Sequence, residues 1–437
     1  DGGFAVSWYD ESSGKYLTRA FQNDTEKATF SDTATAISGL TAADVADLAE
    51  LGISSLSVSD GGAVTLAKAA ASALAAISGL SIGGASSVTV TGTGASLADF
   101  SVTDIAALNT IGVTSMDATN DALSLSLAQA QAYVSAGITL ASGDRVTVTL
   151  SATELADLTA SNLLDLSGIG VDGLDLSGNA ASLTLARLDT ILDTGLRFAS
   201  SDAITIVDSQ INVGDLTTLQ IATLSTRGVS AIDLTDLYDQ VILSLAQAQA
   251  FIDGTIHFAA DDTVVVEVTT ADLAALDAND IADLASIRVD MLRTTAGAVS
   301  IDTALYAALL GNGIVIDAGI ENVTLVDTGA NLAALTLVQI SALQDNDIRQ
   351  LDASDNLVSL SYERIAALQD AGASFAAGDI VRLKVDSAGL AGLDGAMLAN
   401  ALSFGATEIT SSSANLDATA ATLATVLASG LVFADEI

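Results

Sequence analysis

The segment Leu125-Ser-Leu-Ala-Gln-Ala-Gln-Ala132 occurs a second time, letter for letter, at Leu243–Ala250. The two copies start 118 residues apart, which is two periods of 59 residues. A fixed internal period is the sequence signature of repeat architectures, in which a unit buries its apolar face only by stacking on its neighbours. The segment therefore predicts a repeat protein with a unit of about 59 residues.

An apolar quartet with the spacing apolar-x2-apolar-x4-apolar-x2-apolar extends this period along the chain. It occurs seven times in one frame, at intervals of 58 to 60 residues. The seven quartets begin at Ile37, Leu97, Leu155, Val213, Leu273, Leu332 and Leu390. We therefore expect about seven repeats of 58–60 residues.

A helix start signal follows the second apolar residue of each quartet. The expected N-caps are Thr41, Ser101, Thr159, Thr217, Asp277, Thr336 and Asp394. Oxygens of such side chains accept hydrogen bonds from the free N–H groups of a first turn. Capping-box partners stand three residues later in all copies except the last, which has Met397. The pattern predicts a helix of roughly three turns that ends near a glycine, such as Gly52 or Gly112.

Short runs rich in β-branched residues surround this helix and indicate strands. We expect a first strand, the capped helix, a second strand, a turn, a second helix and a third strand in each period. Examples are Val146–Leu150 for the first strand, Val229–Leu234 for the second, Ser126–Gly137 for the second helix and Ile138–Ala141 for the third strand. One period then holds two strand–helix coils of roughly 29 residues each.

The predicted fold is an α/β, right-handed strand–helix solenoid that covers residues 28–437. The handedness follows from the strong preference of parallel strands for right-handed crossovers. Residues 1–27 differ, because aromatic residues gather there, and we expect a β-hairpin from Gly2–Trp8 and Lys15–Phe21. This N-terminal β-hairpin segment is a cap or the tail of a preceding module.

Three resemblances to known protein families bear on the architecture and the location of the protein. The phrase Asp1-Gly-Gly-Phe-Ala-Val-Ser-Trp8 resembles a β-repeat of very large secreted bacterial adhesins. The stretch Val171–Asn179 resembles a leucine-rich-repeat strand with its terminal Asn, which implies a similar solenoid architecture. The composition is rich in Ala, Thr, Ser, Asp and Leu, and it resembles type I-secreted surface proteins and surface-layer proteins of Gram-negative bacteria. These resemblances imply secretion and a place on the bacterial cell surface.

Charge and residue usage exclude several classes of function. The chain has 437 residues, with 54 acidic and 14 basic side chains and a formal net charge of −40. Such a surface argues against nucleic acid and anionic membranes as partners. Cysteine is absent and histidine occurs once, as His257, so thiolate and histidine-rich metal sites are excluded. His257 is expected on a solvent-facing strand position. No apolar stretch of about 20 residues predicts a transmembrane helix.

Four aspartates recur at one position of the second strand: Asp117, Asp175, Asp233 and Asp352. Stacked carboxylates repel one another unless a cation neutralises them, so we assign these residues as candidate ligands of Ca2+. The alternative is a ladder of turn-capping aspartates on a solvated edge. A second column in the turns between strands consists of Asp144, Asp202, Asp262 and Asp379.

The function predicted from these features is that of a non-enzymatic, extracellular structural or adhesive repeat protein, as in a matrix, filament or surface layer. The alternatives are a glycan- or protein-binding module and a calcium-dependent polysaccharide-acting enzyme, for which Arg145, Arg197 and Arg288 are too scattered. No catalytic or cofactor-binding residue is predicted. Because Leu431–Ile437 repeats a closing strand and turn with no polar cap, we also expect end-to-end self-association, in a chain cut from a longer array or completed by a neighbour. Cell-surface glycans or matrix proteins are the other expected partners.

Overall fold

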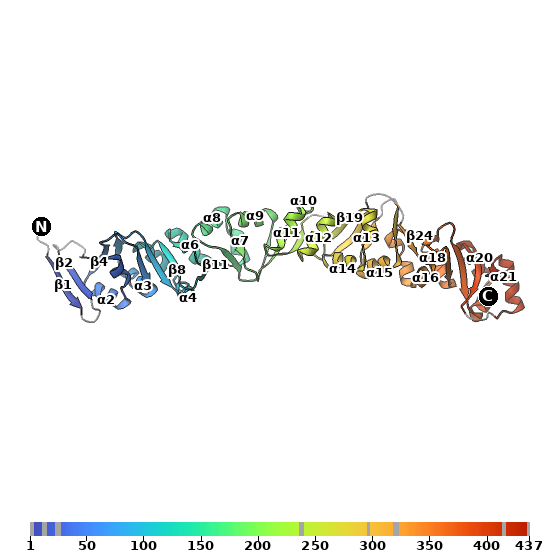
Figure 1. Ribbon diagram of the computed structural model, residues 1–437, viewed down its shortest axis with the longest axis horizontal. Coiled ribbons are helices and arrows are strands. Elements are labelled where there is room, and N and C mark those ends of the chain that lie inside the picture. The colour runs from blue at the N-terminus through green and yellow to red at the C-terminus, as the bar shows by residue number, and fades with distance from the viewer. Residues whose placement is uncertain are drawn as a thin grey trace. The chain divides into compact units, whose positions relative to one another are not determined.

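The computed structural model describes residues 4–10, 15–21, 28–235, 240–294, 298–317, 323–412 and 417–434. The chain forms two compact units, Asp1–Ile206 and Val207–Ile437. Strands and helices alternate along both units (Figure 1). Residues 11–14, between the two expected strands of the hairpin, and the final residues 435–437 lie outside the described part.

The elements of the first unit are short. Its helices are α1 (Ala34–Ser38), α2 (Ala42–Glu50), α3 (Lys68–Ala75), α4 (Gly94–Leu97), α5 (Val102–Thr110), α6 (Leu127–Ala136), α7 (Ala152–Asp157), α8 (Ala160–Gly168) and α9 (Leu185–Asp193). Its strands are β1 (Phe4–Asp10), β2 (Lys15–Phe21), β3 (Ala28–Asp32), β4 (Ile53–Val58), β5 (Val64–Ala67), β6 (Ser81–Gly83), β7 (Val88–Gly92), β8 (Ser115–Ala118), β9 (Ala122–Ser126), β10 (Thr139–Leu140), β11 (Arg145–Leu150), β12 (Gly173–Leu176), β13 (Ala180–Leu183), β14 (Arg197–Phe198) and β15 (Ala203–Asp208).

The second unit continues the same alternation. Its helices are α10 (Gln210–Gly214), α11 (Thr218–Ser225), α12 (Leu245–Asp253), α13 (Thr270–Ala275), α14 (Ala278–Ser286), α15 (Thr303–Asn312), α16 (Gly329–Ala334), α17 (Leu337–Ser341), the 3-10 helix η1 (Gln344–Asn346), α18 (Tyr362–Asp370), α19 (Ser387–Gly392), α20 (Gly395–Phe404) and α21 (Ala420–Ser429). Its strands are β16 (Val229–Leu234), β17 (Gln240–Ser244), β18 (His257–Phe258), β19 (Thr263–Val268), β20 (Val289–Thr294), β21 (Val299–Ile301), β22 (Val315–Asp317), β23 (Val323–Asp327), β24 (Ile348–Ala353), β25 (Leu357–Leu360), β26 (Ser374–Phe375), β27 (Ile380–Val385), β28 (Ala406–Ser411) and β29 (Val432–Phe433).

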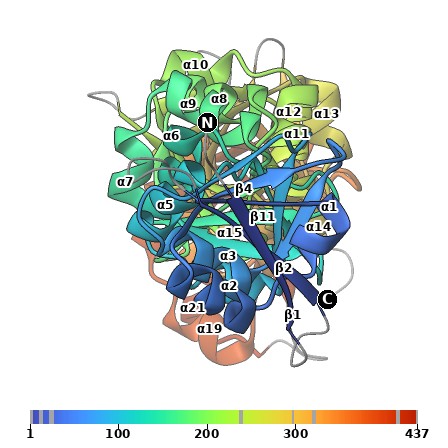
Figure 2. The same ribbon diagram turned by 90° about the vertical axis from the view of Figure 1, so that its left-hand side faces the viewer.

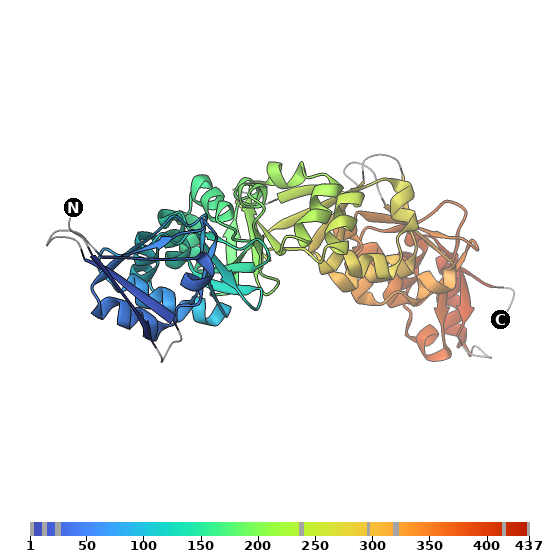
Figure 3. The ribbon, with the colours of Figure 1, turned by 60° about the vertical axis from the view of Figure 1, so that its left-hand side comes forward.

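The strands of the repeats pair in parallel, and the order in each sheet shows how the coils stack. The first unit contains the orders β10-β8-β7-β5 and β14-β12-β11-β9. The second contains β17-β19-β20-β22, β21-β23-β24-β26 and β25-β27-β28-β29. Neighbouring strands of each sheet come from successive coils, as Figure 3 shows by the closeness of similar colours within each unit. This arrangement is an α/β solenoid, with two coils in each period. At the N-terminus, β1 and β2 form an antiparallel pair (Figure 2).

The core of each unit lies between the parallel strands and the helices. On β11, Val146, Val148 and Leu150 are buried, whereas Arg145 is exposed. Strand side chains alternate between the two faces of a sheet, so only one face of β11 contributes to the core. The helices close this core with one apolar stripe each, such as Ile105 of α5. Parallel stacking therefore joins the small apolar faces of single coils into a continuous core.

The seven expected N-caps are confirmed. Each cap residue begins its helix, and its side chain accepts a hydrogen bond from a backbone N–H of the first turn. Six of the seven helices carry the full capping box, and α20 lacks it because Met397 has no side-chain acceptor. The glycines expected near the ends of these helices have positive φ, for example +70° at Gly52 and +92° at Gly112.

The first apolar residue of each quartet lies in a short helix of its own, which the sequence analysis did not predict. In α7, Ser151 is a second N-cap with its own capping box, and Leu155 fills the core. Leu158 then has an extended backbone conformation, so the helical conformation ends there before α8 begins. Helices of four to six residues are too short for a 3.6-residue period to be visible, so only their caps mark them in the sequence.

A further strand lies where only a turn was expected before the second helix. It is β9 in one copy and β17 in another, and it pairs with the first strand of the following coil. In β9 only Leu123 and Leu125 are buried. Two inward residues are too few to distinguish a strand from the start of the helix that follows.

Candidate functional site

The four candidate calcium ligands lie on the outward face of the second strands. Asp117 is on β8, Asp175 on β12, Asp233 on β16 and Asp352 on β24, and all four are half-buried. Their strand neighbours inside the core are apolar, for example Met116 beside Asp117. The alternation of the strands thus places these carboxylates on the surface of the sheet opposite the helices.

These aspartates do not stack directly on one another. Across the sheet, Asp117 lies beside Thr91, and Asp175 lies beside Thr149. The strands that carry the four aspartates, β8, β12, β16 and β24, belong to four different sheets. The expected column of carboxylates at single-strand distance is therefore not formed.

Three of these aspartates, Asp117, Asp175 and Asp233, instead lie near an aspartate of the second column. Asp144 is only 6% exposed; burial raises the pKa of its carboxyl, and the charge of Asp117 adds to this effect. Burial also raises the pKa of Asp202, with a contribution from Asp175. The structure thus brings three members of each expected column together as carboxylate pairs.

The pair formed by Asp233 and Asp262, in the second unit, has the largest shift. Burial, together with the charges of Asp233 and Asp261, raises the pKa of the Asp262 carboxyl to about 6. Asp262 is 7% exposed. Because the charged form is disfavoured there, a proton or a cation at this pair relieves the repulsion.

The turn aspartates connect successive coils. The carboxylate of Asp144 accepts the backbone N–H of Ala118 at 2.8 Å, and Asp262 accepts that of Leu234 at 3.2 Å. Asp202 and Asp379 accept the corresponding N–H groups of Leu176 and Ala353. We call these contacts inter-coil brackets, since each carboxylate holds a backbone N–H of the preceding coil. This geometry favours a structural role for the second column.

Further inter-coil brackets come from residues that the sequence reading missed. Asp60 accepts the N–H of Ala34 at 3.0 Å, Asn120 that of Gly94 at 2.7 Å and Asp355 that of Gly329 at 2.8 Å. A second set uses Asp172 and Asp290, which accept the N–H groups of Val146 and Val264. A separation of 26 residues between donor and acceptor is common to both sets and was the available sequence signal.

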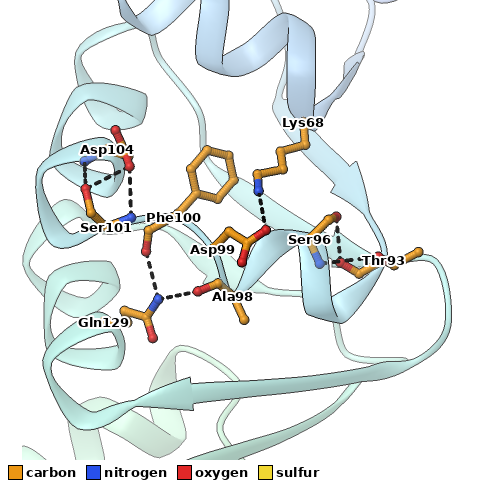
Figure 4. A network of polar contacts seen from close by, with 9 residues as sticks. All are labelled: Lys68, Thr93, Ser96, Ala98, Asp99, Phe100, Ser101, Asp104 and Gln129. Atoms are coloured by element: carbon orange, nitrogen blue, oxygen red, sulfur yellow. Dashed lines mark hydrogen bonds and ion pairs between the residues drawn. The ribbon is translucent and has the colours of Figure 1, made fainter.

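The repeated Gln of the Leu-Ser-Leu-Ala-Gln motif has two functions. Gln129 Oε1 accepts from the N–H of Ser126 in the capping box of α6. Its Nε2 donates to the carbonyl oxygens of Ala98 and Phe100, both at 2.7 Å, where the chain leaves α4 (Figure 4). Gln247 repeats this arrangement. The carbonyls left free at the break between two short helices are thereby satisfied.

Basic residues fill the same role in other copies or neutralise nearby acids. Arg187 donates from Nη2 to the carbonyl oxygens of Leu155 and Leu158. In the fifth repeat Arg293 stands where other copies have the aspartate, and its Nε is 3.0 Å from Asp317. Lys68 lies 3.2 Å from Asp99 and above the ring of Phe100 (Figure 4).

The described residues contain no group of three or more His, Cys, Asp or Glu side chains that could hold a metal ion. Further acidic side chains surround the carboxylate pairs: the charges of Asp121 and Asp172 also raise the pKa of Asp144, and that of Asp261 raises the pKa of Asp262. His257 is half-buried on β18, beside the buried Phe258. In the part of the chain that the structure describes, no helix is long and apolar enough to cross a membrane.

Comparisons with known proteins add little to this picture. No protein-family profile matches the chain, and no curated protein matches it. Among solved structures, the chain is similar to the leucine-rich repeat-containing protein LegL7 from Legionella pneumophila. The identity is 13%, the match covers 71% of this chain and 97% of that one, and the TM-score is 0.17.

Proposed function

We propose that the chain is a non-enzymatic structural repeat protein of the bacterial cell surface, with adhesive or matrix-forming character. The observation that supports this proposal is that polar side chains form hydrogen bonds between neighbouring coils. Buried and half-buried Asp, Asn, Gln and Arg residues hold coil to coil, as Asp144, Gln129 and Arg187 do. Hydrogen bonds between coils at such short intervals stabilise the stacked fold, as expected for a protein with a structural role.

The composition supports an extracellular place. A chain without cysteine or proline, with few lysines and with repeated local contacts, suits export in the unfolded state and folding outside the cell. Both hydrogen-bond partners of an inter-coil bracket lie about one coil apart in sequence. Local contacts of this kind form quickly, so folding does not have to wait for distant parts of the chain.

Self-association is part of this proposal. The coil formed by α21 and β29 exposes Leu423, Leu427 and Val432 to 45%, 83% and 59%, and these residues line a groove of about 490 Å³. Corresponding faces of earlier helices are covered by the next coil, as α20 is by α21. A second copy that places a coil on this face would continue the same stacking, in an open head-to-tail arrangement.

Sedimentation of the chain over a dilution series tests this function, together with electron microscopy of the concentrated protein. We expect concentration-dependent elongated oligomers, and we expect Leu427→Lys to weaken their formation at least tenfold. Leu219→Lys is the matched control, because Leu219 is 75% exposed on the side of α11. A chain that stays monomeric at all concentrations, or that associates equally well with Leu427→Lys, would contradict self-association.

The glycan-binding alternative rests on one feature, a groove in the second unit with two basic side chains. The polysaccharide-acting enzyme is less favoured. It would need a free arginine beside an acidic cluster, and Arg197 already donates to the carbonyl oxygen of Leu196 at 2.8 Å.

A further inference from the structure

A groove of about 640 Å³ opens in the second unit between α16 and the corner formed by β25, α18 and β27. The small residues of α16 line part of the groove. Its lining also includes Ser359 and Ser361 and two cations, Arg364 and Lys384. The volume is within the usual range for sites that bind small molecules.

The two cations are available to a ligand. Arg364 is held in place by a hydrogen bond of 3.0 Å from its Nε to the carbonyl oxygen of Leu335. Among the described residues its Nη groups make no further hydrogen bond, and the Lys384 ammonium makes no ion pair. A fixed guanidinium with free N–H groups, next to an ammonium, is suited to a carboxylate.

This pair of cations is a departure from the repeat. The position of Arg364 holds Gln129, Arg187, Gln247 or Leu305 in four other copies. Strand pairing places Thr149, Val207, Glu267 or Val326 at the position of Lys384. None of these four copies has two basic residues, so neither the fold nor the stacking requires them.

The other polar groups of the groove define the ligand further. Asp355 accepts the N–H of Gly329 through one carboxylate oxygen, and its side chain is exposed. Its negative charge opposes a second carboxylate but accepts hydrogen bonds from hydroxyls, as do Ser359 and Ser361. The net charge of −40 also repels polyanions before they reach the groove. The groove therefore matches one carboxylate that is accompanied by several hydroxyls.

We propose that this groove binds a free sugar acid, a monosaccharide with a single carboxylate. The carboxylate pairs with Arg364 and Lys384, and the hydroxyls bond to Ser359, Ser361 and Asp355. The ring lies against the alanine-rich wall of α16. This binding is independent of the structural function proposed above.

Calorimetric titration of the full chain with glucuronate, glucose and acetate tests the proposal. We expect glucuronate to bind at least tenfold more tightly than either of the others. Binding of acetate equal to that of glucuronate would overturn the role of the hydroxyls, and equal binding of glucose would overturn that of the cations. A trimer of galacturonate should bind more weakly than its monomer, and tighter binding would overturn the choice of a free, singly charged ligand.

Two variants borrow residues from other copies, so the fold is expected to tolerate them. Arg364→Gln introduces the residue of Gln129 and Gln247 and keeps a donor for the Leu335 carbonyl oxygen. Lys384→Thr introduces the residue of Thr149. Each should weaken glucuronate binding at least tenfold. The control Arg187→Gln makes the same change in another copy and should leave binding unaltered. Equal binding by all the variants, or loss of binding in the control, would overturn the assignment.

Discussion

At the scale of single residues, Tyr133 and Phe251 directly follow the two copies of the repeated segment and so occupy equivalent positions. Tyr133 is fully buried, and its hydroxyl finds no hydrogen-bond partner among the described residues. Phe251 is equally buried and has no hydroxyl to satisfy. Equivalent buried positions of the repeat thus hold a Tyr and a Phe. A buried hydroxyl without a partner lowers the free energy of unfolding by about 1–3 kcal/mol.

We predict that Tyr133→Phe stabilises the protein, with a gain of about 1 kcal/mol in the free energy of unfolding. Tyr306 is the matched control, since it is also buried but donates to the carbonyl oxygen of Gln339. Tyr306→Phe should therefore destabilise the protein. Thermal and denaturant unfolding of both variants measure the difference, and shifts of the same sign would contradict this account.

The turn aspartates predict an unusual dependence of stability on pH. The pKa of Asp262 is raised to about 6 in the folded protein, and those of Asp144 and Asp202 are also raised. The folded state therefore binds protons more tightly than the unfolded state between about pH 6 and the ordinary value of 3.8. Stability should increase as the pH falls from 7 through this window.

Below that window the trend reverses. Hydrogen bonds from capping residues hold the pKa values of Asp104, Glu154 and Asp272 below their usual values, so their contribution is lost as the pH falls through them. We predict a maximum of thermal stability near pH 4–5. Asp262→Asn keeps an acceptor for Leu234 and should flatten the rise between pH 7 and 5 by on the order of 1 kcal/mol. An unchanged rise in this variant would contradict the assignment to Asp262.

At the scale of elements, the sequence predicted the parts that depend on local chemistry. Caps such as Thr41 and Asp277 were recognisable because a helix end needs an acceptor at a fixed position. The inter-coil brackets have no such local signature, because the separation of 26 residues does not by itself show which N–H group faces Asp144. That pairing depends on the register between neighbouring coils. The repeat length of 58–60 residues does not reveal this register, because each period contains two coils of unequal length.

We predict that Gln129→Glu destabilises the protein by about 1–3 kcal/mol, because the variant keeps the acceptor of the capping box but loses the donor to two carbonyl oxygens. Gln131→Glu adds the same charge at an exposed position of the same helix and is the control. Gln129→Arg should be close to neutral, since Arg187 makes the equivalent contacts. Thermal unfolding of the three variants tests this, and equal losses for both glutamate variants would indicate an effect of charge alone.

At the scale of the whole molecule, a net charge of −40 acts against the folded state, because the carboxylates repel one another. Pairs such as half-buried Asp117 with buried Asp144 concentrate this repulsion where water screens it least. Monovalent salt weakens the interactions of exposed charges, but it acts less on buried ones. A divalent cation that binds the folded state at a pair stabilises it by mass action.

We therefore predict that millimolar Ca2+ raises the midpoint of thermal unfolding more than NaCl at the same ionic strength, with a chelator as the baseline. Replacing both Asp117 and Asp175 with Asn should remove most of the difference between the two salts. The control replaces Asp157 and Asp165, which are exposed in the same unit, and should retain it. An unfolding midpoint that is equal in chelator and in calcium would exclude stabilisation by this cation. An equal response to both salts would mean that screening is the whole effect and that the paired aspartates are brackets without a bound metal.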